Sequence, residues 1–219
     1  MPRRAEVPLE PRKSPVQARS IASVDAILDA TIQVLLSVGT ERLTTSRVAM
    51  RAGVAVGSLY QYFPNKSALI QAVLQRHLEG VTAVVERVCR EQKGKTLQQM
   101  AVALTTAFIN AKMRDVKSSV ALYAVSSHVD AAKIAQAMGI RSNKAIAEML
   151  VTSREPLAKD PELVASMLQG AMTGVMRRLL ECGDPEKQLD GVREELPQLV
   201  NGYLAACSAR PSAAATPMV

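Results

Sequence analysis

Tryptophan is absent from the 219 residues, and aromatic side chains are scarce, with four tyrosines and two phenylalanines. Because 48% of the chain is nevertheless hydrophobic, its core must be built from Ala, Leu, Val and Met. Aliphatic side chains of this kind favour the packing of helices over the packing of sheets. The composition therefore predicts an all-α protein, with length for one large domain or for a small domain and a larger one.

Cysteine is too sparse for a structural framework. Cys89, Cys182 and Cys207 are odd in number and form no CxxC pair, which argues against a disulfide scaffold and against a zinc site. The two histidines, His77 and His128, lie far apart, and no Ser/His/Asp set or pair of carboxylates has catalytic spacing. We therefore expect no metal, no cofactor and no catalytic residue.

Long apolar runs are also missing. No stretch reaches the roughly 18 uninterrupted apolar residues of a membrane span, and the segment MPRRAEVPLEPRKSP lacks the apolar centre of a signal peptide. The run KGKT at 93–96 resembles the end of a phosphate-binding loop, but Cys89 stands where that loop needs glycine. We expect a cytoplasmic protein without a membrane or nucleotide site.

Positive charge is present and unevenly distributed. The formal net charge is +7, and residues 1–76 hold ten Lys and Arg against five Asp and Glu. A basic N-terminal third favours a polyanionic partner, because cationic side chains release counterions from phosphates. Charge alone is equally compatible with a merely basic soluble protein.

Proline, glycine and capping residues divide the chain into about nine predicted helices, with no convincing strand. Gly39 and Gly53 end the first two helices, and Thr44 or Thr45 caps the second. Pro197 cannot donate to the carbonyl of Arg193, so it must kink the last helical region or restart it. The other helices are predicted from Asn65 to about Glu91, at about 96–111, 117–129 and 131–151, and after the starts Asp160-Pro161 and Asp184-Pro185.

The stretch RAGVAVGSLYQYFPNK, residues 51–66, holds three of the six aromatic side chains. Two helices of under ten residues flank its glycine-containing turn, which is the plan of a helix-turn-helix. Leu59 is the single large aliphatic of the second helix, so it points into the core with Phe63. Gly57 costs about 1 kcal/mol of helix stability relative to alanine, and close approach of another molecule is a reason to keep it.

Residues 44–70, TTSRVAMRAGVAVGSLYQYFPNKSALI, resemble the DNA-binding signature of the tetracycline-repressor (TetR) family of bacterial transcription regulators. The resemblance is strong over about residues 17–75. It implies a three-helix DNA-binding domain whose recognition helix spans about Val54–Tyr62. It also implies a larger helical domain that dimerises and usually holds a small effector. We expect a disordered basic arm at 1–14, a helix-turn-helix domain at 15–65, an effector-binding and dimerisation domain at 66–207, and a disordered tail at 208–219.

The resemblance also implies a role for individual residues, although packing is the alternative role for Tyr60 and Tyr62. Arg47 matches a position near the groove, where it reaches a base or a phosphate. Gln61 stands beside the groove-facing positions. Thr44, Thr45, Tyr60, Tyr62 and Lys66 match phosphate contacts, Ser46 lies near the groove, and Val56, Gly57 and Ser58 match the base-facing positions.

The chemistry of this helix limits which bases it reads. Guanine is best read by Arg or Lys and adenine by Asn or Gln, as bidentate pairs. The predicted groove face instead offers Val56 for a thymine methyl and Ser58 for either base type. We therefore expect Arg47 and the basic arm to supply much of the affinity, and apolar contact and DNA shape to supply sequence choice.

The larger half has helical periodicity but no motif, so its interpretation follows composition and the resemblance. A small-residue stripe predicts close approach of another helix, either in a dimer bundle or within one subunit. Six methionines between 100 and 172 are consistent with an adaptable apolar cavity or with a plain core. The predicted pocket residues are Met100, Leu104, Phe108, Tyr123, His128, Met138 and Met167. The predicted dimer residues are Leu168, Gly170, Ala171, Met172, Gly174, Val175, Leu179, Leu199, Val200 and Tyr203.

These observations predict a homodimeric, ligand-responsive transcription regulator that is not an enzyme. The leading hypothesis is a repressor released from a palindromic double-stranded DNA operator by a small, largely apolar effector. An activator or a ligand-independent regulator of the same fold is the nearer alternative. An all-helical small-molecule enzyme or carrier is the alternative from another class.

Overall fold

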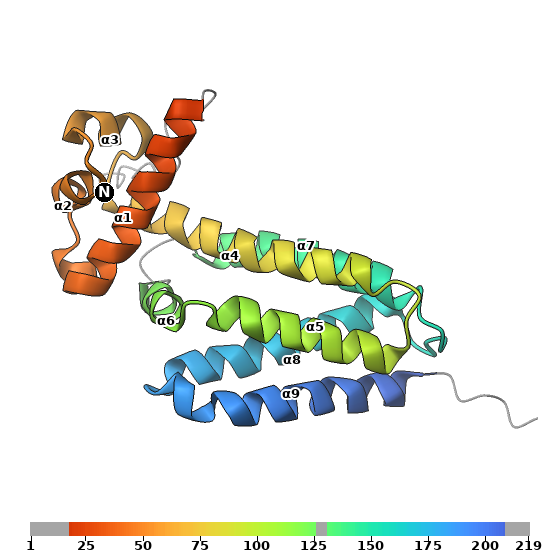
Figure 1. Cartoon of the computed structure of the whole chain (residues 1–219). Coiled ribbons are helices and arrows are strands. Elements are labelled where there is room, and N and C mark those ends of the chain that lie inside the picture. Colours follow the sequence, from red (N-terminus) through yellow and green to blue (C-terminus); the bar gives the residue numbers. More distant parts are fainter. Residues whose placement is uncertain (1–17, 126–130, 209–219) are drawn as a thin grey trace, which may run out of the picture. The chain divides into compact units, whose positions relative to one another are not determined.

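The computed structural model describes residues 18–125 and 131–208, and side chains from residue 21 onward. Within these ranges the chain forms nine α-helices and no strand beyond an isolated bridge between Leu157 and Ser208 (Figure 1). The all-α prediction is therefore confirmed. The predicted arm at 1–14, most of the predicted tail and His128 lie outside the described residues.

The chain divides into two compact units, which do not follow the predicted domain limits. Among the described residues, unit 1 comprises 18–80, 113–125 and 131–137, and unit 2 comprises 81–112 and 138–208. A prediction from the sequence order alone has no means of assigning a later segment to the first unit. Unit 1 takes in such a segment, because α6 (Val116–Val125) packs against α1 (Ala18–Arg42).

Unit 1 is built on α1, α2 (Thr45–Ala52), α3 (Val56–Tyr62) and the first part of α4 (Lys66–Glu91). Its core is aliphatic, as the composition predicts, and it includes the buried side chains Ile27, Val48 and Leu59. Phe63 is buried in the same core, as expected. Burial of a side chain of this size contributes about 1.5–3 kcal/mol, so these four positions fix how the short helices pack.

The long run of apolar side chains in α1 contributes to this core. Its residues Ile21–Arg42 form a segment long and apolar enough to cross a membrane, the one such helix in the described ranges, with a mean hydropathy of 1.7. Asp25 and Asp29 interrupt the apolar run, and Val34 and Leu35 are buried in unit 1. The hydrophobic face of α1 therefore packs against α2 and α6 of its own unit.

Local capping residues set the helix ends, mostly where the sequence predicts them. Gly39 interrupts α1 with φ 73°, and Gly53 ends α2 in the left-handed conformation with φ 68°. Thr44, rather than Thr45, is the N-cap of α2. The Asn65 carboxamide oxygen accepts from the Ala68 backbone N–H at 2.9 Å and so starts α4.

Unit 2 contains the rest of α4, with α5 (Leu97–Met113), most of α7 (Ala131–Leu150), α8 (Pro161–Glu181) and α9 (Pro185–Cys207). The antiparallel pair α8 and α9 lie side by side (Figure 1). Pro197 lies inside α9, which continues through it as one helix. The alternative that Pro197 restarts the helix is wrong, because neighbouring turns hold the helix across one missing N–H.

The KGKT run forms a turn between α4 and α5, and hydrogen bonds join it to the α7–α8 connection. The Gly94 backbone N–H donates to the Thr152 hydroxyl at 2.9 Å, and the Arg154 Nε donates to the Gly94 carbonyl at 3.0 Å. The Glu155 carboxylate accepts from the Leu97 backbone N–H at 2.9 Å and caps α5. The backbone groups of this turn are thus used within the fold.

Replacing Glu155 with glutamine is expected to remove part of the pH dependence of stability. The hydrogen bond from the Leu97 backbone N–H lowers the pKa of Glu155. A lowered pKa means that the ionised carboxylate stabilises the fold fully above its ordinary pKa of about 4.3, and that this contribution is lost as the pH falls through the lower pKa of the folded state. In thermal unfolding, wild type should be more stable than Glu155→Gln at pH 7, and the difference should shrink as the pH is lowered further below about 4. Glu194→Gln, an exposed change on α9, should show no such pH-dependent difference from wild type; a difference for Glu155→Gln that did not change with pH would contradict the assignment.

Candidate nucleic-acid interface

The helix-turn-helix geometry is formed by α2, α3 and the turn between them. The Val54 backbone N–H donates to the Ala49 carbonyl at 3.0 Å and closes this turn. The recognition helix begins at Val56 instead of the predicted Val54, because Ala55 is extended at φ −65° and ψ 142°. Leu59 is the buried residue of α3 and anchors the helix to the core.

The predicted base-facing residues Val56, Gly57 and Ser58 lie on the solvent side of α3, together with Tyr60 and Gln61. Val56 is 39% exposed and Tyr60 is 42% exposed, and Gly57, Ser58 and Gln61 are exposed as well. With Leu59 turned inward, the helix presents this set outward at about 100° per residue. A groove that received α3 would meet these side chains first.

Gly57 is not required by the fold. A Cβ built at Gly57 meets no atom of the described chain within 4 Å, and the backbone there is not in the left-handed region. Neither packing nor conformation therefore excludes a larger residue at this place. The open space above the helix is what close approach of an outside molecule needs.

The predicted phosphate-contacting residues come from three helices, and short contacts hold several of them in place. The Thr45 hydroxyl lies 2.9 Å from the Tyr60 hydroxyl, which joins α2 to α3. The Lys66 ammonium donates to the Thr40 carbonyl at 3.2 Å, which ties the start of α4 to the end of α1. The ring of Tyr62 is half-buried against the core, an arrangement that favours the packing role for this residue.

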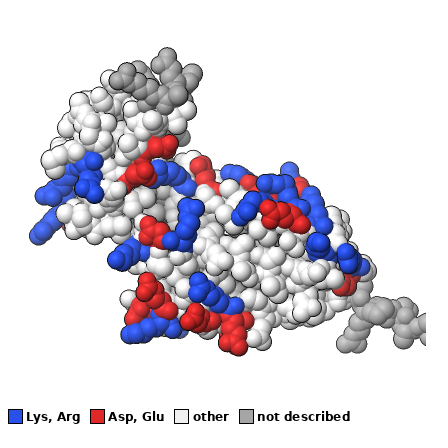
Figure 2. Space-filling view, viewed as in Figure 1, with Lys and Arg blue, Asp and Glu red and all other residues white. Residues whose placement is uncertain are grey.

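Positive charge gathers at one corner of unit 1. Arg42, Arg47 and Arg51 are exposed at the end of α1 and along α2, and Figure 2 shows Lys and Arg side chains together at the edge of this unit. The Arg51 Nε donates to the Gln33 side chain at 2.6 Å. The sequence analysis identified Arg47 as a candidate DNA contact but not Arg42. The position of Arg42, one helical turn before Thr45, was the signal that could have identified it.

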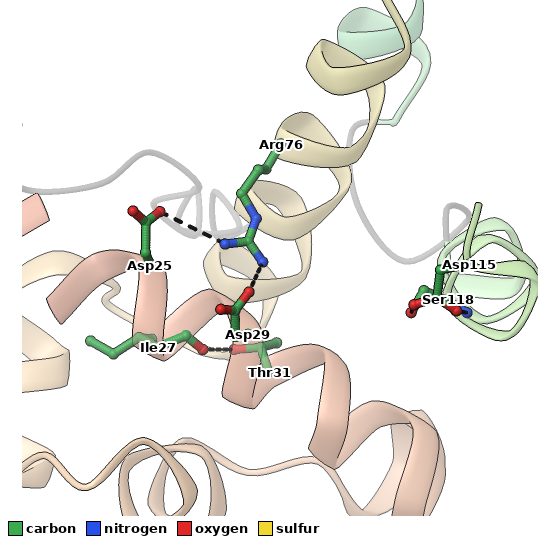
Figure 3. Close-up of polar contacts among 7 residues, drawn as sticks. All are labelled: Asp25, Ile27, Asp29, Thr31, Arg76, Asp115 and Ser118. Atoms are coloured by element: carbon green, nitrogen blue, oxygen red, sulfur yellow. Dashed lines mark hydrogen bonds and ion pairs between the residues drawn. The ribbon is translucent and has the colours of Figure 1, made fainter. Parts of the chain in front are cut away.

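An ion pair that the sequence did not predict fixes α4 against α1. The Arg76 guanidinium lies 2.6 Å from an Asp29 oxygen and 3.7 Å from an Asp25 oxygen, so it reaches across both carboxylates (Figure 3).

Asp115 caps α6 in the same unit by accepting from the Ser118 backbone N–H at 3.0 Å (Figure 3). The hydrogen bonds from Ser118 lower the pKa of Asp115.

The predicted pocket residues are not all brought together. Met100, Leu104 and Phe108 are buried on one face of α5, and Met138 is half-buried on α7. Tyr123, also half-buried, belongs to unit 1. Met167 is 53% exposed on α8, so its side chain does not face the interior of its own subunit.

The predicted dimer residues divide between two faces of α8 and α9. Leu168, Met172, Leu179 and Val200 are buried within the subunit. Gly170 and Gly174 are exposed, and Leu199 is 54% exposed. Ala171, Val175 and Tyr203 are half-buried.

The sequence missed one member of the exposed face. Leu163 is 55% exposed and lies on the same side of α8 as Met167, Gly170 and Gly174, because spacings of four, three and four residues recur on one helix face. This spacing in the sequence could have identified Leu163 as a member of the exposed face.

Two family profiles match the chain. Residues 27–73 match the profile described as "Bacterial regulatory proteins, tetR family", and residues 96–204 match "Tetracyclin repressor-like, C-terminal domain". The first covers the helix-turn-helix, and the second covers α5 to most of α9.

Curated relatives match over the N-terminal part. The HTH-type transcriptional repressor KstR of Mycolicibacterium smegmatis is 44% identical over 61 residues, 28% of this chain and 30% of the relative. The nucleoid occlusion factor SlmA of Haemophilus ducreyi is 34% identical over 67 residues, 31% of this chain and 33% of the relative. The matched segments thus span about a third of the length of these relatives.

Solved structures match over most of the chain. A putative TetR-family regulator from Mesorhizobium loti has a TM-score of 0.71 at 19% identity, covering 88% of this chain and 100% of the other. A complex of SmeT with triclosan has a TM-score of 0.63 at 21% identity, covering 90% and 99%. At these identities the likeness concerns the fold.

Proposed function

We propose, from the premise that this chain belongs to the tetracycline-repressor family of bacterial regulatory proteins, that it is a homodimeric repressor of transcription. Its family makes it a DNA-binding transcriptional regulator rather than an enzyme. The proposal adds that the dimer holds a palindromic operator and leaves it when a small, largely apolar effector binds. In this role the protein acts in the cytoplasm, where the bacterial DNA lies.

The observation that carries the proposal is the outward face of α3. Val56, Ser58 and Gln61 are exposed there, and Gly57 leaves open space above the backbone. Val56 suits a thymine methyl, and Ser58 suits either base type. With no Arg or Lys on this face, sequence choice depends on apolar contact and DNA shape, while the cations of α1, α2 and α4 supply affinity.

The repressor role and the effector class are supported by likeness to other proteins. KstR is described as a transcriptional repressor, and SmeT, the repressor of the multidrug efflux pump SmeDEF of Stenotrophomonas maltophilia, was solved with triclosan. The buried Met100, Leu104 and Phe108 of α5 make the interior of unit 2 apolar. An effector that favours a dimer unable to match both half-sites lowers operator affinity by its differential affinity for the two states.

Capture of genomic DNA by the purified protein, followed by gel shifts on the recovered fragments, tests this function. We expect a two-fold-symmetric sequence to be enriched, and apolar candidate ligands to release it. A reporter gene under the recovered operator separates repressor from activator, since repression requires lower expression when the protein is present. Failure to bind any duplex at low salt would overturn the proposal.

Replacing Lys66 with alanine is expected to weaken binding to all DNA sequences alike. Loss of one phosphate contact per half-site should flatten the plot of log affinity against log salt by about 0.9 for each contact. The same change also removes the donor to the Thr40 carbonyl, so thermal stability should fall as well. Salt titration by fluorescence anisotropy measures the first effect. Lys144→Ala, an exposed change on α7, serves as the control, and an altered base preference would contradict the assignment.

A further inference from the structure

The last turn of α1 carries an exposed arginine, Arg42, that has no polar partner among the described residues. Arg51, another exposed arginine of unit 1, is instead held by Gln33. A long cationic side chain that is left unpaired beside a polyanion-binding surface is available to that polyanion.

The backbone that bears Arg42 is held firmly on both sides. Gly39 breaks the helical path with φ 73° and ψ 175° and so redirects the last turn. The Thr40 carbonyl accepts from the Leu43 backbone N–H at 3.3 Å and from the Lys66 ammonium at 3.2 Å. Leu43 is fully buried and anchors the turn. Arg42 thus extends from a fixed backbone, which lowers the entropy lost when its guanidinium binds.

Arg42 lies close in sequence to Thr44 and Thr45, two of the residues proposed to contact phosphate. Two residues further on, the Thr44 side chain caps α2, and the next residue pairs its hydroxyl with that of Tyr60. We propose that Arg42 is a further DNA-contacting residue, whose guanidinium binds a backbone phosphate beside the one held by Thr45 and Tyr60. This inference rests on the proposed DNA-binding function and extends its contact surface to the end of α1.

A guanidinium suits this position better than an ammonium would. Its planar fork donates two parallel N–H bonds to one phosphate, which a point charge cannot do. Glu41 is the acidic neighbour in the same turn and is also exposed. Because adjacent helical residues diverge by about 100° around the axis, Glu41 and Arg42 present their charges in different directions.

Salt titration of a mixed-sequence duplex and of a selected operator duplex tests the inference with the full-length protein. Arg42→Ala should flatten the salt slope by about 0.9 for each half-site and weaken binding about fivefold per half-site at 0.15 M salt, equally for both duplexes. Arg42→Lys should keep the slope and lose part of the affinity. Arg90→Ala removes another exposed charge, from α4 within unit 2, and should change neither quantity. Glu41→Gln should leave the slope unchanged.

A neutral methylphosphonate placed at successive phosphates of the operator identifies the contact. At one phosphate it should weaken the wild type and leave Arg42→Ala unaffected, a result that a merely structural role of Arg42 would not produce. An Arg42→Ala slope equal to that of the wild type, or a change in base preference, would overturn the inference while leaving the proposed function intact. A wild type that bound no duplex would overturn both. Equal thermal unfolding of Arg42→Ala and wild type excludes a folding defect.

Discussion

Replacing Gly57 with alanine is expected to make the protein more stable and to make it a poorer DNA-binding protein. Alanine favours the helical state over glycine by about 0.5–1 kcal/mol, and a methyl group at this position meets no atom of the described chain within 4 Å. The same methyl group occupies the space that a groove wall would take. Inserting a methylene into a closely packed contact costs about 1–3 kcal/mol, so operator affinity should fall by about that amount per half-site.

Urea unfolding and fluorescence anisotropy on the same preparation measure the two effects of Gly57→Ala. Gly191→Ala is the matched control, because Gly191 is an exposed helical glycine of α9 whose added Cβ likewise meets nothing within 4 Å of the described chain. It should gain a similar stability without losing affinity. Unchanged affinity of Gly57→Ala would mean that the backbone of α3 does not approach DNA closely.

The helix ends could be predicted from the sequence because capping acts over a few residues. Asp160 accepts from the backbone N–H groups of Glu162 and Leu163 and precedes a proline, and all of these groups lie within one turn. Gly53 ends α2 because glycine alone adopts the left-handed conformation without cost. The span of the recognition helix was instead implied by the family resemblance, and its first two predicted residues lie before the helix.

Such local rules did not predict the contacts between helices. Arg76 pairs with Asp29 across 47 residues of sequence, and Thr45 meets Tyr60 across 15. Each pair depends on how helices pack, which hydrophobic burial decides and which no local spacing specifies. The sequence therefore predicted a set of DNA-binding residues, but not how the surrounding side chains hold them.

The division of α8 into two faces could have been predicted from the sequence. At about 100° per residue, Leu168, Met172 and Leu179 fall within one narrow sector. Leu163, Met167, Gly170 and Gly174 fall on the opposite side of the helix. Treating both sectors as one interface combined a buried face of the subunit with an exposed one. The exposed sector is what a second subunit would cover, since large apolar side chains rarely gather on a free surface.

Replacing Gly174 with glutamate is expected to separate the proposed dimer into monomers and to abolish tight operator binding. Gly174 is exposed on α8, and a Cβ there meets no atom of the described chain within 4 Å. Two-fold symmetry would bring two carboxylates into the same apolar contact, where unpaired charges are strongly disfavoured. Because each half-site alone lacks the effective concentration that the dimer provides, apparent affinity should fall by about 10²–10⁴.

This substitution distinguishes an interface position from a core position, because the single subunit should still fold with glutamate at position 174. Glutamate is a better helix former than glycine, and in α8 it stands four residues before the exposed Arg178, a favourable spacing for an ion pair. Leu168→Ala, on the buried face, should instead cost about 2–5 kcal/mol of stability. Sedimentation velocity should show Gly174→Glu as a folded monomer and Thr106→Glu, an exposed change on α5, as a dimer. A Gly174→Glu protein that stayed dimeric would place the subunit contact elsewhere than on α8.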